Sequence, residues 1–167
     1  MTSAPPTEEV SDLARDFLDV AKRRSVEYRL PVRRETATLT FADGTRREGT
    51  LFFQVGEKTA DVFEPGDSFL PVAGEGKVRL YARGTIACAS IPQNHAEDDE
   101  VHLVVRKVTV HLRSGHMLEG EVRYAPSVER ARAIDYLNSA PKGFTVHEAG
   151  IVHYVAKDHV DYVEETE

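Results

Sequence analysis

The sequence lacks several features that would assign it to a particular class of protein. Cys88 is the only cysteine, so no intramolecular disulfide can form, and the apolar segment Ile86–Ala89 around it predicts a small core residue. No stretch is apolar over the length that crosses a bilayer, and the N-terminus has no charged segment followed by an apolar one. We therefore expect a soluble cytoplasmic protein that makes no membrane contact.

A net positive charge is missing as well. The net charge is −7 at pH 7, whereas a protein that binds mainly by neutralising phosphates needs a clustered cationic surface. The short basic clusters at 22–24, 33–34 and 46–47 lie in the first part of the chain, and residues 92–100 and 158–167 are acidic. This asymmetry favours head-to-tail self-association over a nucleic-acid surface.

Motifs of catalysis and cofactor binding are missing. There is no Gly-x-Ser-x-Gly elbow for a nucleophile, and Gly74-Glu75-Gly76-Lys77 has the composition of a hairpin turn without the spacing of a phosphate-binding loop. Three of the seven histidines, His147, His153 and His159, are evenly spaced, which matches no known pattern of metal ligands. We expect a protein that is not an enzyme and holds neither a metal nor a cofactor.

The N-terminal region predicts one amphipathic helix. After a leader at residues 1–6 that we expect to be disordered, apolar residues recur at helical spacing across residues 7–25, and acidic residues precede basic ones as the helix dipole favours. Phe17 and Leu18 lie on the apolar stripe. They are candidate partner-binding residues, and the alternative is that the helix covers its own domain.

Strand-like alternation begins after the helix, and one hairpin pattern occurs twice. Residues 37–49 align with residues 108–120 without a gap, and Asp43-Gly44 and Ser114-Gly115 supply the turns. The match continues downstream with a few inserted residues, and it pairs the following positions: Asp61 with Asp135, Phe69 with Phe144, and Tyr81–Ile86 with Val155–Val160. The two aspartates are predicted to have structural roles at turns or bends.

These observations predict a mainly β fold with two small barrels of the SH3 or Sm type in tandem behind the N-terminal helix. We expect the helix and the first barrel within residues 7–91, an acidic linker at residues 92–100, and the second barrel at residues 101–165. Residues 127–138 are compatible with either a short helix or a strand.

The repeated hairpin resembles the first signature of the Sm-like (LSm/Hfq) family, in which a glycine turn is followed by a second glycine. Here the glycines are Gly44 and Gly49, then Gly115 and Gly120. The first of each pair can take a positive φ, and the second lets a long strand bend around the core. Arg83-Gly84 is a weaker match to the second signature. The second unit also resembles small uncharacterised bacterial domains.

The resemblance implies a small barrel that pairs its strand edges with other subunits, so a homo-oligomer is expected. The favoured function is a non-enzymatic protein-binding or scaffold module that acts through barrel edges and the N-terminal helix. RNA binding is the main alternative, and the residues that would carry it are Arg46, Arg47, Arg83, Asn138 and Lys157. A small-ligand-binding barrel is a third alternative, since Arg33-Arg34 before a strand is similar to the start of PilZ-type domains.

Overall fold

The computed structural model describes residues 32–64, 68–94, 103–126 and 132–166. The chain divides into two units, Met1–Val32 and Arg33–Glu167. The predicted N-terminal helix at residues 7–25, with Phe17 and Leu18, lies outside the described residues, as does the predicted leader.

Two stretches of the described chain have the same order of elements, and we call them the first half (residues 32–92) and the second half (residues 104–166). The first half contains β1 (Val32–Phe41), β2 (Arg46–Gln54), α2 (Thr59–Phe63), β3 (Phe69–Gly74), β4 (Lys77–Ala82), the 3₁₀ turn η1 (Arg83–Thr85) and β5 (Ile86–Pro92). The second half contains β6 (Val104–Leu112), β7 (Met117–Tyr124), α3 (Ala133–Ser139), β8 (Gly143–Glu148), β9 (Ile151–Ala156), η3 (Lys157–His159) and β10 (Val160–Thr166).

The glycines of the repeated hairpin have the roles that the sequence predicts. Gly44 and Gly115 form the tight turns of the β1–β2 and β6–β7 hairpins with φ of 84° and 86°, a region that residues with a Cβ rarely adopt. A Cβ on Gly120 would lie 2.6 Å from the carbonyl oxygen of His147. This close approach lets β7 bend onto β8, and Gly49 is similarly crowded by Val72 on β3.

Asp61 and Asp135 have equivalent structural roles, but in short helices and not at the turns or bends that the sequence predicts. Each is the third residue of a short helix, and its carboxylate accepts a hydrogen bond from the backbone N–H that precedes the helix, at 2.8 Å from Lys58 and 3.2 Å from Arg132. Asp135 therefore lies in a helix, and of the two structures that the sequence allowed around this residue, the strand is wrong.

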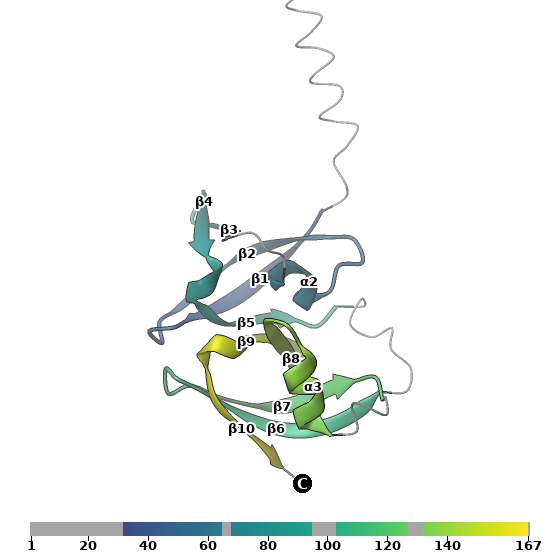
Figure 1. The fold of residues 1–167 in the computed structure, drawn as a ribbon. Helices are drawn as coiled ribbons and strands as arrows, with labels where there is room; N and C mark the ends of the chain where they lie inside the picture. Colours follow the sequence, from purple (N-terminus) through teal and green to yellow (C-terminus); the bar gives the residue numbers. More distant parts are fainter. Residues whose placement is uncertain (1–31, 65–67, 95–102, 127–131, 167) are drawn as a thin grey trace, which may run out of the picture. The chain divides into compact units, whose positions relative to one another are not determined.

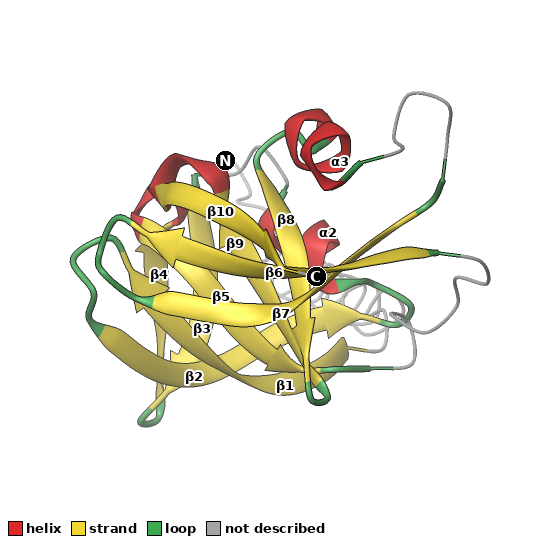
Figure 2. Ribbon diagram, turned by 90° about the horizontal axis from the view of Figure 1, so that it is seen from below, coloured by secondary structure: helices red, strands yellow, loops and turns green. Residues whose placement is uncertain are grey.

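All ten strands of the described residues belong to one sheet, in the order β10-β6-β7-β8-β9-β5-β1-β2-β3-β4. The pairings that the structure resolves residue by residue are antiparallel. The prediction of two closed small barrels is therefore wrong, although the fold is mainly β, and Figure 2 shows how strongly the sheet curves. The physical reason lies at β5 and β9, which pair with each other and thereby use the strand edges that closing each half would need.

Most of the buried apolar residues form two clusters, and each cluster draws most of its members from one half. The first core consists of Ala37, Leu39, Phe41, Leu51, Phe53, Val62, Phe63, Leu70, Val72, Ile86, Ala89, Ile91 and Tyr154. The second core consists of Ala87, Cys88, Val108, Val110, Leu112, Val122, Tyr124, Ala133, Phe144, Val146 and Val155. Because side chains alternate across a strand, β5 and β9 contribute residues to both cores, and a register shift against β1 places both Ala87 and Cys88 of β5 in the second core.

The burial of Cys88 agrees with the sequence prediction, whereas the match of Phe69 to Phe144 is wrong by one residue. Leu70 pairs with Tyr81 as Phe144 pairs with Val155. Phe69 is 55% exposed and Leu70 only 2% exposed, because a shift of one residue moves a side chain to the other face of the sheet.

Among the described residues, no helix has the length and apolar character needed to cross a membrane.

Candidate functional site

The pairing of β5 with β9 joins the two halves. It runs from Cys88 opposite Val155 to Pro92 opposite Ile151, and the two strands lie side by side in Figure 1. Tyr154 of β9 reaches into the first core, where its ring stacks on Phe63 with centroids 4.9 Å apart. Its burial raises the pKa of the hydroxyl to about 12. A side chain of the second half thus completes the core of the first.

The strand β4 occupies in the first half the place that β9 occupies in the second. Val78 and Leu80 on β4 correspond to Val152 and Tyr154 on β9, since η1 and η3 follow at the same distance. Val78 and Leu80 are 60% and 66% exposed, while Val152 and Tyr154 are 0% and 4% exposed. The β5–β9 pairing therefore buries apolar side chains on β9, whereas the equivalent side chains on β4 are exposed to solvent.

The strand β10 likewise occupies the place of β5. Both β4 and β10 are end strands of the sheet, so each has one edge that pairs with no other described strand. Next to β10 is a cavity of about 390 Å³, lined mainly by apolar side chains of α3, β8 and β10, among them Leu137, Phe144 and Val163. This cavity occupies in the second half the position that the Tyr154 side chain fills in the first core. Together, the two edges and this cavity form the candidate interaction site.

The two edges carry opposite charge. Lys77 and Arg79 lie on β4, and β10 contains Asp161, Glu164 and Glu165. Each central charge has a partner on its own chain, since Arg79 is 2.7 Å from the Glu75 carboxylate and Glu164 is 3.0 Å from His111 Nε2. These pairs are exposed and therefore contribute little to stability.

Two of the candidate RNA-binding residues, Arg83 and Lys157, occupy equivalent positions in the two halves and have the same structural role. The Arg83 guanidinium donates to the Val62 carbonyl at the end of α2, and the Lys157 ammonium donates to the Ala140 carbonyl after α3. A cation at the carboxyl end of a helix satisfies carbonyl groups that have no partner in the helix. Both residues line one cavity of about 490 Å³ at the β5–β9 junction.

The structure does not bring the other candidates to this cavity. Arg46 and Arg47 are exposed at the start of β2, and the Arg47 guanidinium lies 5.9 Å from the ring centroid of Phe41. Asn138 is exposed on α3 and lines the apolar cavity next to β10 with Lys157, whose ammonium is 3.4 Å from the Asn138 carbonyl. The five predicted residues therefore do not form one surface.

A hydrogen-bonded chain of Ser90, His153 and Glu148 was not predicted from the sequence. Ser90 Oγ is 2.8 Å from His153 Nδ1, and His153 Nε2 is 3.1 Å from the Glu148 carboxylate. His153 is 6% exposed and directly opposite Ser90 in the β5–β9 ladder. Both ring nitrogens of His153 have partners within the fold. Because Ser90 belongs to the first half and His153 to the second, their hydrogen bond links the two halves. Sequence spacing holds no signal for it, since Ser90 and His153 meet only through strand pairing.

The titration of His153 makes stability depend on pH. Burial lowers the pKa of His153 below its ordinary value of 6.5, against the opposing effect of Glu148. The unfolded chain thus takes up a proton before the folded one does, so we expect the free energy of unfolding to fall as the pH drops below about 6.5. Urea unfolding at about pH 7.5 and pH 5.5 measures this loss. His153→Gln should reduce the difference between the two pH values, and an unchanged difference would contradict this assignment.

Other candidate chemistry is limited. Burial raises the pKa of the Cys88 thiol to about 12, which keeps it protonated and unreactive. Within the described ranges, no group of three or more histidine, cysteine, aspartate or glutamate side chains is placed to hold a metal ion.

Comparison of the chain with protein-family models, with curated proteins and with solved structures found no match.

Proposed function

We propose that this chain is a non-enzymatic scaffold or protein-binding module that self-associates by adding a strand to an open edge of its sheet. One observation carries the proposal: Val78 and Leu80 on the end strand β4 are 60% and 66% exposed, although the corresponding residues of β9 are buried by pairing with β5. An end strand offers unpaired N–H and C=O groups to a partner strand. An apolar stripe on such a strand supplies the burial that makes pairing favourable.

The tandem arrangement of two equivalent units supports this proposal. The halves share their order of elements, and the β9–β5 pairing already joins the fourth strand of one to the fifth strand of the other. We place the function in the cytoplasm, where a free thiol such as that of Cys88 stays reduced. The N-terminal stripe with Phe17 and Leu18 stays a predicted second contact.

Absolute mass in solution, measured by light scattering across a range of concentrations, tests the proposal. We expect a discrete oligomer or a mass that rises with concentration, and Leu80→Glu should lower it towards that of one chain because it places a charge on the pairing face. Val55→Glu is the matched control, since Val55 is 71% exposed in the turn after β2, which is not an end strand of the sheet. A monomer at all concentrations, with or without RNA, would refute self-association.

RNA binding is a second candidate, favoured by the cavity at the β5–β9 junction that Arg83, Lys142 and Lys157 line together. Repeating the mass measurement with added cellular RNA separates it from the first. A monomer that gains mass only with RNA would favour the second candidate. Reversal of the charge at Lys142, which lines this cavity, would then weaken binding, and the affinity would fall steeply with salt.

A further inference from the structure

Resting on the proposed function, we propose that the strand added to β4 is β10 of a second copy of this chain. The added strand takes the register of the β5–β9 junction, so copies join head to tail. The interface thus joins two different surfaces of the same chain. The partner of β4 is a strand that carries acidic residues and lies next to an apolar cavity.

The register follows from the correspondence between the halves. In the chain, Ala89 pairs with Tyr154, Ser90 with His153, and Ile91 with Val152. Replacing each residue by its equivalent in the other half gives the pairs between copies: Val163 with Leu80, Glu164 with Arg79, and Glu165 with Val78.

Charge complementarity supports this register. It places Glu164 directly opposite Arg79, where the in-chain junction has the 2.8 Å contact of Ser90 with His153. Opposite charges on facing strands stabilise a pair, and like charges destabilise it. Pairing β4 with another β4 would bring together basic strands that contain Lys77 and Arg79, and pairing two β10 strands would bring together acidic ones. Only the unlike pairing brings opposite charges together.

The apolar contacts support the same arrangement. In the first core, Tyr154 of β9 packs against Phe63 at the end of α2. The residue equivalent to Tyr154 is Leu80, and the residue equivalent to Phe63 is Leu137, which lines the cavity of about 390 Å³ next to β10. In the proposed pairing, Leu80 of one copy therefore enters this cavity of the next. Leu80 is buried there as Tyr154 is buried in the chain.

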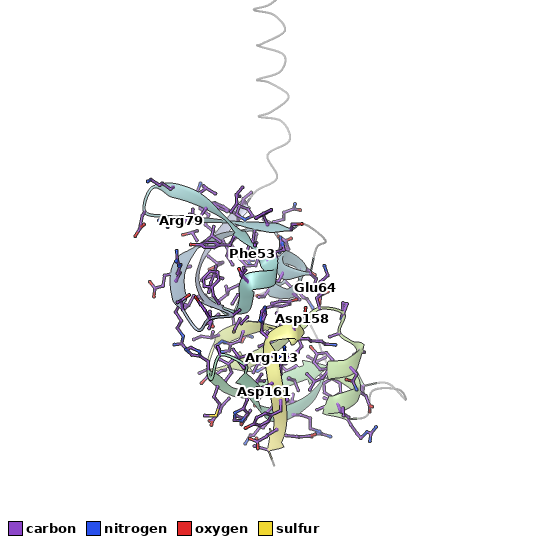
Figure 3. All side chains as sticks on the ribbon, turned by 60° about the vertical axis from the view of Figure 1, so that its left-hand side comes forward. Phe53, Glu64, Arg79, Arg113, Asp158 and Asp161 are labelled. Carbon is purple, nitrogen blue, oxygen red and sulfur yellow. The ribbon has the colours of Figure 1, made fainter. Side chains whose placement is uncertain are left out.

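A single chain cannot make this contact with itself. Figure 3 shows Arg79 on β4 and Asp161 on β10 towards opposite ends of the described unit. An interface between two different faces leaves one free edge at each end of a dimer, so it repeats until a ring closes or a filament grows.

Charge reversal on each edge tests the inference. We expect Arg79→Glu and Glu164→Arg, each alone, to weaken self-association by at least about tenfold, because each places like charges opposite each other. An equimolar mixture of the two variants should recover the assembly, since each joins the other through unlike charges. The dissociation constant is measured by sedimentation equilibrium of the full chain. Arg34→Glu is the matched control, a charge reversal on β1 inside the sheet, and circular dichroism checks that each variant is folded.

The outcomes separate this inference from the proposed function. Loss in both single variants with recovery in the mixture supports head-to-tail pairing. Assembly that Glu164→Arg leaves unchanged, or that the mixture fails to recover, overturns the pairing of β4 with β10 while self-association stands. An unmodified chain that remains a monomer overturns both. Leu80→Glu gives a second measurement that does not depend on charge pairing, since it must also disrupt the assembly.

Discussion

Phe53→Ala is expected to lower the free energy of unfolding by about 3–5 kcal/mol, as removal of a buried aromatic ring leaves a cavity as well as losing apolar burial. Phe53 is 0% exposed on β2, and its ring belongs to the first core. The Arg33 guanidinium lies 4.8 Å from the ring centroid, so the ring also supports a cation–π contact. Urea unfolding followed by circular dichroism measures the change.

The matched control is Val55→Ala, in the turn that follows the same strand. Val55 is 71% exposed, so its truncation should change stability by less than about 0.5 kcal/mol. A loss for Phe53→Ala that is no larger than that of the control would show that the first core does not depend on this ring.

Gly120→Ala is expected to lower the free energy of unfolding by about 1–3 kcal/mol, because an added methyl group has no room. The new Cβ would lie 2.6 Å from the His147 carbonyl oxygen and 2.7 Å from Val146 Cγ1. The carbonyl belongs to the backbone of β8, so relieving the clash requires the bend between β7 and β8 to open. Thermal and urea unfolding both measure this loss.

Gly84→Ala provides the comparison for this prediction. A Cβ at Gly84 would meet nothing within 4 Å, and the residue is exposed in η1. Its substitution should therefore be nearly neutral. Equal stability of the two alanine variants would mean that the β7–β8 approach can relax, contrary to the role that we assign to Gly120.

Local features of the fold were predictable because they depend on neighbouring residues. The turns at Gly44 and Gly115, the close approach at Gly120 and the burial of Cys88 follow from side-chain size and strand alternation. Equivalent roles for Asp61 and Asp135 followed from the repeat, although the sequence suggested a possible short helix only around Asp135 and none around Asp61. The sequence alignment placed Phe69 one residue out of register, because it matched two phenylalanines and ignored which positions of the strand face the core.

The candidate interaction site was only partly predictable. Unlike charge in the two parts of the chain suggested head-to-tail association, and the acidic tail does contain β10, but none of the basic clusters named from the sequence lies on β4. The sequence drew attention to Arg83 and Lys157 as basic residues, whereas the structure uses both to hold short helices. The exposure of Val78 and Leu80 was not predicted, because the sequence of a strand does not show whether a neighbouring strand covers its apolar residues.

By itself, the sequence predicted the two repeated hairpins, where they turn, and that one pattern recurs along the chain. Only the tertiary structure decided that β5 pairs with β9, that the halves therefore form one open sheet instead of two closed barrels, and that β4 and β10 are left as its ends. The physical reason is that every strand edge presents the same backbone N–H and C=O groups. Which edge meets which partner therefore depends on the packing of side chains distant in sequence, as when Tyr154 of the second half completes the core of the first.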